Sequence, residues 1–188
     1  MKIKNNKGSI EVICGPMFSG KTEELICRVK NAKKNNAKLN PLVFKPMVDT
    51  RYSKSKVVSH NKNAIECKPI KNIREILSLK NKSKMIAIDE VQFFEKEIVF
   101  VCNQLANEGV RVVVSGLDMD FMGTPFGEMP YLIAISEKVT KMKALCNCCG
   151  NEATYTHRKD REKKLILLGE EKKYEALCRS CFIKKNSK

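Results

Sequence analysis

The stretch GPMFSGKT, residues 15–22, decides the fold of this chain. It matches the phosphate-loop pattern G-x-x-x-x-G-K-S/T and lies between an expected strand, residues 9–14, and an expected helix, residues 22–35. Glycines let backbone N–H groups surround phosphate oxygens, and the helix N-terminus adds partial positive charge. Lys21 would reach the β- and γ-phosphates, and the Thr22 hydroxyl would bind Mg²⁺. The predicted phosphate-binding residues are Gly15, Pro16, Met17, Phe18, Ser19, Gly20, Lys21 and Thr22, and a glycine turn without a ligand is the alternative.

Two carboxylates follow a buried strand later in the chain. Residues 85–88 are apolar and lead directly into Asp89 and Glu90. A phosphate-loop enzyme needs an acidic group beside its metal, and we expect Asp89 to hold Mg²⁺ through water. Glu90 would point past the strand end and could take a proton from an attacking hydroxyl. Two solvated acids that open a turn are the alternative.

The phosphate loop by itself leaves the acceptor open. A GTPase would need a guanine-reading Asn-Lys-x-Asp, and the nearest string, residues 81–84, lacks the aspartate. Water as acceptor would make the protein an ATPase, whereas a small-molecule hydroxyl would make it a kinase.

Strand-like and helix-like segments alternate over the first three-quarters of the chain. Apolar runs separated by helices predict an α/β fold of the doubly wound kind, with a mostly parallel sheet covered on both faces. The long polar stretch at residues 46–63 has no clear periodicity, and loops of this length are usually functional or mobile. The expected strands are 9–14, 39–44, 85–89 and 111–115, and the expected helices are 22–35, 72–79 and 95–108.

The C-terminal part changes character from about residue 139. Cys146-x-x-Cys149 and Cys178-x-x-Cys181 form two knuckles that suit tetrahedral zinc, and β-like segments are expected at 154–157 and 165–168. A site with four thiolates has no open position, so its zinc should be structural. Cys148 could compete with Cys149, and five buried free cysteines are the alternative. We predict a phosphate-loop domain at 1–141 and a zinc-binding domain with a short basic tail at 142–188.

Composition limits the remaining possibilities. The chain has 188 residues, a formal charge of +15 and nine cysteines. Cysteines without a secretory leader favour reduced thiols or metal ligands over disulfides, and a cytoplasmic location is expected. No apolar run is long enough to cross a membrane. The charge invites a nucleic-acid hypothesis, but the lysines are spread through solvated stretches with little aromatic interleaving.

The chain resembles the type II thymidine kinases nearly end to end, from Ile10 to Phe182. The matching strings are GPMFSGKT (15–22), KPMVDTRYS (45–53), VVSH (57–60), IDEVQFF (88–94), SGLDMDF (115–121), PFGEMP (125–130), VTKMKALCNCC (139–149) and KYEALCRSC (173–181). The resemblance implies a RecA-like α/β domain, a zinc-bearing lasso domain and a homotetramer. It also implies transfer of the ATP γ-phosphate to the 5′-hydroxyl of thymidine, with Mg²⁺ and structural Zn²⁺ as cofactors and thymidine triphosphate as feedback inhibitor.

The resemblance also assigns roles to individual residues. Glu90 matches the general base and Asp89 the acid on the metal side. The expected substrate-binding residues are Met17, Asp49, Arg51, Phe93, Leu117, Phe121, Thr156 and Tyr174. Three positions depart from the family pattern, namely Val91, Met122 and Glu170, and the last replaces a glycine in the lasso.

A second hypothesis keeps the phosphate loop but changes the function. In it the chain is a basic ATPase whose zinc module grips nucleic acid. A nucleic-acid-binding ribbon would concentrate arginines and aromatic residues at 151–174, and this segment instead carries mixed charge. The sequence therefore favours a thymidine kinase that acts without nucleic acid or membrane.

Overall fold

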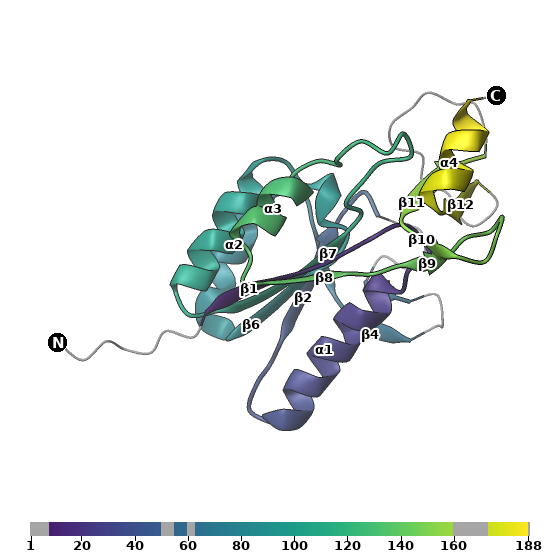
Figure 1. Ribbon diagram of the computed structural model, residues 1–188. Coiled ribbons are helices and arrows are strands. Elements are labelled where there is room, and N and C mark those ends of the chain that lie inside the picture. Colours follow the sequence, from purple (N-terminus) through teal and green to yellow (C-terminus); the bar gives the residue numbers. More distant parts are fainter. Residues whose placement is uncertain (1–7, 50–54, 60–62, 160–172, 188) are drawn as a thin grey trace.

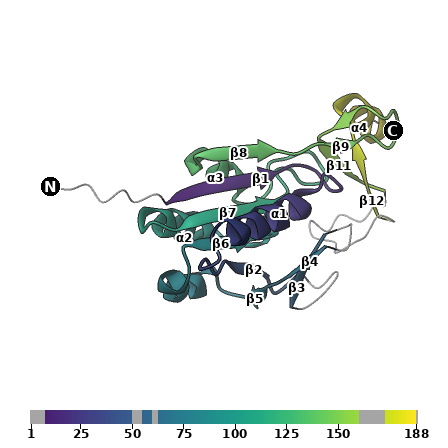
Figure 2. The same cartoon turned by 90° about the horizontal axis from the view of Figure 1, so that it is seen from below.

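Six strands form the main sheet of the protein, in the order β5-β2-β6-β7-β1-β8, and every pairing is parallel. The computed structural model describes residues 8–49, 55–59, 63–159 and 173–187. Figure 2 shows the succession of strands from β8 at one edge to β5 at the other. The strands are β1 (Ser9–Cys14), β2 (Leu42–Pro46), β5 (Lys68–Ile70), β6 (Met85–Ile88), β7 (Arg111–Gly116) and β8 (Lys138–Lys141).

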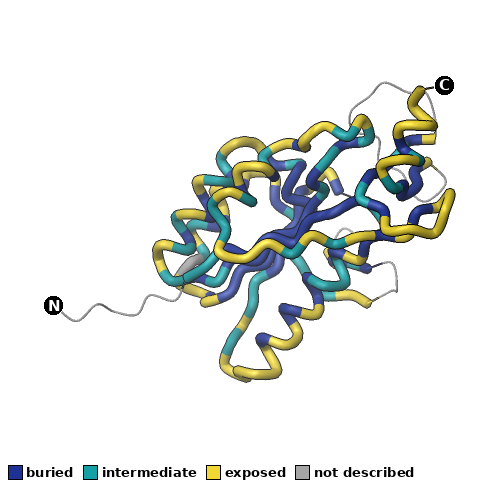
Figure 3. The backbone as a smooth tube through the Cα atoms, viewed as in Figure 1, coloured by how far each residue is buried: buried dark blue, intermediate teal, exposed yellow. Residues whose placement is uncertain are grey.

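Helices cover both faces of this sheet (Figure 1). One apolar core lies beneath the 3₁₀ helix η1 (Ile73–Lys82) and the helices α2 (Glu97–Asn107) and α3 (Met129–Ile135). The other lies beneath α1 (Lys21–Asn35), and Val57 of the hairpin β3 (Lys56–Val58) and β4 (Ala64–Glu66) joins it. The central strands are buried on both faces and are therefore rich in Val and Ile. Figure 3 shows this buried sheet between helices whose outer faces are exposed.

A small module lies beyond the carboxyl ends of β1 and β8 (Figure 1). It contains the pairs β9 (Ala144–Leu145) with β10 (Glu152–Ala153) and β11 (Tyr155–Arg158) with β12 (Tyr174–Leu177), followed by α4 (Arg179–Asn186). Its own core includes Tyr155 stacked on Phe182, with 4.5 Å between ring centroids. Met119, from the loop after β7, packs against this core and joins the module to the main sheet.

A buried ion-pair network fastens the amino-terminal half of the sheet. Glu11 on β1 contacts Arg28 of α1 at 2.8 Å and Arg111 of β7 at 2.6 Å, and Arg28 also donates to Thr140 of β8. Burial disfavours the charged form of Glu11, but the hydrogen bond and charge of Arg111, together with Arg28, outweigh it and lower the pKa of this carboxyl. One carboxylate therefore links two strands and a helix, and Arg28 extends the network to a third strand.

The α/β class and the mostly parallel sheet predicted from the sequence are confirmed. The predicted strand at 39–44 begins only after Pro41, and the helix expected at 72–79 is a 3₁₀ helix. The sequence missed α3, β8 and the three-residue strands β3, β4 and β5. The three short strands lack measurable periodicity, and β8 is an exposed edge strand fixed by its pairing with β1. The β-like segment expected at 165–168 lies outside the described residues.

Within the part of the chain that the structure describes, no helix is both long and apolar enough to span a membrane.

Candidate functional site

The phosphate loop connects the end of β1 to the start of α1, as the motif requires. Gly15 and Gly20 have positive φ angles of 144° and 81°. A Cβ on Gly15 would lie 2.4 Å from the carbonyl oxygen of Met142, so only glycine fits here. Both Ser19 Oγ and Lys21 Nζ donate to the carbonyl of Pro16, at 2.8 Å and 2.6 Å. The ammonium of Lys21 therefore lies over the loop that it would share with a nucleotide.

Asp89 lies at the carboxyl end of β6, beside the first turn of α1. The hydroxyl of Thr22 donates to Asp89 Oδ2 at 3.2 Å, and the N–H of Glu90 donates to Oδ1 at 3.0 Å. Ser115, at the end of β7, donates a hydrogen bond to the same Oδ1. The hydroxyl and the carboxylate are oxygen ligands of the kind that Mg²⁺ prefers, so these residues fit that ion. Sequence reasoning found Thr22 and Asp89 but missed Ser115, which only the parallel pairing of β6 and β7 brings close.

Glu90 follows in a left-handed backbone conformation, with φ 53° and ψ 43°. This conformation is uncommon for a residue with a side chain. It ends β6 and starts the short 3₁₀ turn η2 (Val91–Phe93), and the Glu90 carboxylate accepts a hydrogen bond from the amide of Gln92. The side chain is buried and lines the same cavity as the phosphate loop.

That cavity brings together residues from three separate predictions. Phosphate-loop residues, the Asp89–Glu90 pair and three expected substrate residues, Met17, Asp49 and Leu117, all line it. Strand β3 and Ser59 line one side, within the long polar stretch whose length is typical of functional or mobile loops. The lining residues are Met17, Phe18, Gly20, Lys21, Thr22, Glu23, Lys45, Asp49, Lys56, Val57, Val58, Ser59, Asp89, Glu90 and Leu117.

Lys45 adds a buried cation to this cavity. It lies at the end of β2, its Nζ is 3.9 Å from Asp49 Oδ2, and it donates to the carbonyl of Lys56 at 3.3 Å. With Lys21 and Lys56 it places three lysines among the acids of the lining, and such cations attract an anionic ligand. Arg51, expected in the same region, lies outside the described residues.

Four expected substrate residues, Phe93, Phe121, Thr156 and Tyr174, do not line this cavity. Thr156 of β11 accepts a hydrogen bond from the N–H of Met17 at 2.9 Å, which ties the module to the phosphate loop. Phe93 packs edge-on against Phe126, with 6.0 Å between ring centroids. Sequence reasoning did not select Phe126 as a site residue, although it stands in the quoted string PFGEMP.

Arg158 brings Phe121 and Tyr174 together. Its guanidinium carbon lies 3.7 Å from the ring centroid of Phe121, and it donates to the hydroxyl of Tyr174 at 2.9 Å. Arg158 is 5% exposed, so this contact between the β7 loop and the module is buried. Nothing in the local sequence singled out Arg158.

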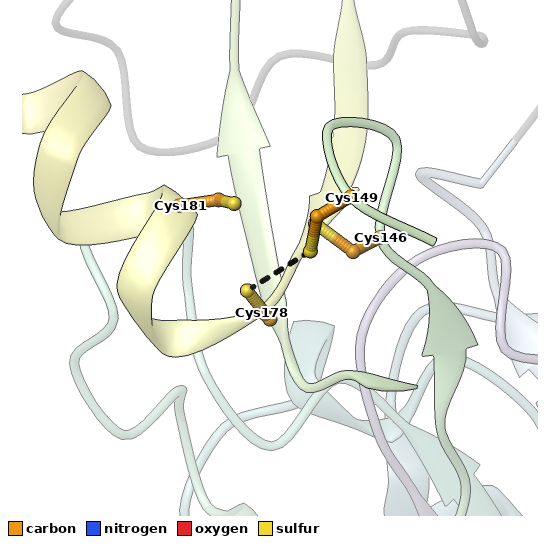
Figure 4. Close-up of side chains that lie close together, drawn as sticks. All are labelled: Cys146, Cys149, Cys178 and Cys181. Atoms are coloured by element: carbon orange, nitrogen blue, oxygen red, sulfur yellow. Dashed lines mark hydrogen bonds between the residues drawn. The ribbon is translucent and has the colours of Figure 1, made fainter. Parts of the chain in front are cut away.

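Four cysteine sulfurs converge in the small module, as Figure 4 shows. The Sγ atoms of Cys146, Cys149, Cys178 and Cys181 all lie within 4.8 Å of one another, and those of Cys149 and Cys178 are 3.7 Å apart. Tetrahedral zinc with Zn–S bonds of about 2.3 Å places sulfurs about 3.8 Å apart, so the donor set fits this metal. Cys148 is exposed and is not part of the cluster, which removes it as a competing ligand in this arrangement.

The four thiols do not share one tendency to ionise: hydrogen bonds with neighbouring thiols raise the pKa of Cys149 and Cys181, whereas the pKa of Cys146 is lowered. Burial raises the pKa of the Cys146 thiol, but backbone N–H groups of Cys178, Cys148 and Cys149 outweigh it and lower that pKa to about 6. Thiolate is the form that binds metal.

These features define a class: a phosphate-loop α/β protein with an acid pair at the phosphate loop and a four-cysteine module above it. The thymidine kinase family model matches residues 8–182, and the chain belongs to the thymidine kinase family. The thymidine kinase of Bacteroides fragilis (strain YCH46) is 52% identical over 176 residues, which is 94% of this chain and 87% of that protein. The thymidine kinase of Porphyromonas gingivalis (strain ATCC 33277) is 48% identical over 192 residues, with 99% and 93% covered. Among solved structures, domain III of the Thermotoga maritima replication initiation protein DnaA matches 74% of this chain and 56% of that chain, with 18% identity and a TM-score of 0.46.

Proposed function

We propose that this protein transfers the γ-phosphate of ATP to the 5′-hydroxyl of thymidine and releases thymidine monophosphate. The observation that carries this proposal is one cavity that holds both the phosphate loop and the Asp89–Glu90 pair, in a chain that matches thymidine kinases over almost its full length. The mixed charge around the cavity gives no support to a nucleic-acid-stimulated ATPase.

The donor side of the reaction belongs to the phosphate loop. Residues 15–22 would bind the phosphates through backbone N–H groups, with Lys21 turning from the Pro16 carbonyl to the β- and γ-phosphates. Thr22 and Asp89 would hold Mg²⁺, which neutralises charge that develops on the phosphates when it is bound. Ser115 keeps the Asp89 carboxylate in place.

The acceptor side belongs to Glu90 and the surrounding pocket residues. Glu90 would act as the general base that receives the proton of the 5′-hydroxyl as the oxygen–phosphorus bond forms. In a loose transition state the base contributes mainly through positioning and late proton transfer. Asp49 and Arg51 would face the reacting phosphate and nucleoside, and Met17, Phe93, Leu117, Phe121, Thr156 and Tyr174 would surround the nucleoside.

The zinc site would be structural and would hold the lasso module above the nucleoside. Cys146, Cys149, Cys178 and Cys181 supply the four thiolates, leaving no open position for chemistry. We place the division between the two domains at residues 141 and 142. A homotetramer, inhibition by thymidine triphosphate and a cytoplasmic location complete the proposal.

The test is phosphate transfer from labelled ATP with magnesium to a panel of nucleosides, beside reactions with no nucleoside and with DNA. We expect transfer to thymidine and none to cytidine or purine nucleosides. Glu90→Gln should lower kcat by about a hundredfold or more, since general bases contribute about 10²–10⁴-fold. The matched control is Glu95→Gln, which changes an exposed glutamate outside the cavity. ATP hydrolysis that rises with DNA, without transfer to any nucleoside, would refute the proposal.

A further inference from the structure

Gln92 is a buried polar side chain beside the cavity, and the proposed phosphoryl transfer assigns it no role. It lies in the η2 turn two residues after Glu90 and is 4% exposed. Its Nε2 donates to Oε2 of Glu90, and its Oε1 accepts from the N–H of Leu117 at 3.0 Å. An amide has one donor end and one acceptor end, so these two neighbours together fix which way it points.

Two glycines make room for Gln92, one at its side-chain amide and the other at its backbone carbonyl. A Cβ on Gly116 would lie 2.4 Å from Oε1 of Gln92, and a Cβ on Gly127 would lie 2.8 Å from its backbone oxygen. Real Cβ atoms essentially never approach another heavy atom so closely. Gln92 therefore occupies a slot between the end of β7 and the turn that precedes α3, and the slot exists only because both positions lack side chains.

The two hydrogen bonds connect the proposed base to the backbone at the end of β7. Glu90 is the proposed base, and Leu117 lines the cavity beside it. A glutamate side chain has several rotatable bonds, and a general base works only when its oxygen lies within hydrogen-bond reach of the proton it removes. The Gln92 amide is held by the N–H of Leu117, at the end of β7. Because this amide is fixed, its N–H restricts the orientation of the Glu90 carboxylate relative to the pocket.

We infer that Gln92 is a positioning residue for phosphoryl transfer, whose amide orients the Glu90 carboxylate and anchors it to the end of β7. The inference rests on the proposed function. Gln92 has no contact with substrate in this assignment and acts through Glu90.

Two substitutions separate this role from a structural one. Gln92→Glu preserves size and an oxygen that can accept from Leu117, but it presents a carboxylate oxygen to Glu90 in place of an N–H. Gln92→Met has similar length and removes both hydrogen bonds without adding charge. If only the bond to Leu117 matters, Gln92→Glu should have a higher kcat than Gln92→Met. If the amide orients Glu90, Gln92→Glu should have the lower kcat of the two.

The experiment measures kcat, KM for thymidine, KM for ATP and the melting temperature of both variants beside the unmodified protein. We expect kcat to fall about a hundredfold in Gln92→Glu, at the lower end of general-base effects, and about tenfold in Gln92→Met, where the base keeps its place but loses its orienting donor. KM for ATP should stay within about twofold, because the phosphate loop is untouched. Both variants should still melt as folded proteins, with Gln92→Glu at the lower temperature because it buries a second carboxylate against Glu90.

A matched control shows whether a glutamine-to-glutamate exchange beside another glutamate lowers kcat wherever it is made. Gln104 also donates an amide N–H to a glutamate, Glu108 at 3.2 Å, on the exposed surface of α2. Gln104→Glu should leave all kinetic constants unchanged.

Three results would overturn the inference: unchanged kcat in Gln92→Glu, an equal or larger loss of kcat in Gln92→Met, or a loss confined to KM. Absence of thymidine phosphorylation by the unmodified protein would instead refute the proposed function, so the two failures are distinguishable.

Discussion

Replacing Gly15 by alanine should reveal how tightly the phosphate loop is joined to the chain segment that enters the four-cysteine module. The new Cβ would lie 2.4 Å from the Met142 carbonyl oxygen, whereas ordinary contact starts at 3.4 Å, so about 1 Å of displacement is needed. Met142 donates its own N–H to the carbonyl of Cys14 at 2.7 Å, and this displacement would weaken that bond.

The magnitude follows from two terms. Holding a non-glycine residue at a φ of 144° costs about 1–3 kcal/mol. Losing the hydrogen bond from Met142 adds about 1 kcal/mol. We expect the free energy of unfolding to fall by about 3 kcal/mol, and the melting temperature by about 6–12 °C for a chain of this length. KM for ATP should rise, since Gly15 starts the phosphate loop.

Gly150→Ala supplies the matched control. Gly150 also has a positive φ, 75°, but its Cβ would meet nothing within 4 Å. This variant should therefore lose only about 1 kcal/mol. Both proteins are compared in their zinc-loaded form by chemical denaturation and by thermal melting. Equal destabilisation of the two variants would refute the reasoning, because it would mean that the Met142 carbonyl can move away from the new Cβ without a loss of folding free energy.

Three further predictions concern the ion-pair network, the metal and the pocket. Glu11→Gln should lower the free energy of unfolding by about 3 kcal/mol, because it leaves Arg28 and Arg111 without their buried carboxylate partner. Because the folded pKa of Glu11 is lowered, its stabilisation is complete above the ordinary value of 4.5 and is lost as pH falls through the folded pKa, so urea unfolding of the two proteins should converge in acid. Cys178→Ser should lose zinc by metal analysis and raise KM for thymidine while the main sheet remains folded. Arg158→Lys should raise KM for thymidine about fivefold, because lysine cannot both stack on Phe121 and keep the planar hydrogen-bonding geometry of arginine.

Each of these has a control and an opposing result. A stability difference for Glu11→Gln that grows in acid would contradict the lowered pKa. Cys148→Ser should keep its zinc, and loss of zinc there would contradict the four-ligand assignment. Arg179 lies 5.0 Å from the ring of Tyr155 on exposed α4, so Arg179→Lys should leave KM unchanged. An unchanged KM in Arg158→Lys would mean that its contact with Phe121 does not shape the pocket.

Local chemistry made part of the site predictable. The phosphate loop needs a glycine-rich turn between a strand and a helix, and Asp89 and Glu90 directly follow a run of buried residues. The spacing of the two C-x-x-C knuckles likewise predicts a zinc site. In the first two cases the residues that act together are neighbours in the sequence. In the third, two distant motifs can be paired because both have the C-x-x-C spacing.

Other parts of the site could not be predicted, because they depend on contacts between distant segments. Ser115 reaches Asp89 only because β6 and β7 pair in a particular register, and Gln92 reaches Leu117 across the same two strands. Arg158 lies far along the chain from Phe121 yet covers its ring. No periodicity or motif marks such residues, because serine, glutamine and arginine are also common at exposed positions that have no role in a site.

The sequence by itself determined the α/β class, the phosphate-loop motif, the acid pair and the two cysteine pairs that form the cluster, because hydrophobic period and motif spacing act over a few residues. The tertiary structure alone decided that strand β3 lines the cavity, that Thr156 ties the module to the phosphate loop, and that Gln92 donates a hydrogen bond to the proposed base. The physical reason is that a hydrogen bond or a steric contact between distant segments depends on strand order and register, which only the packed fold specifies.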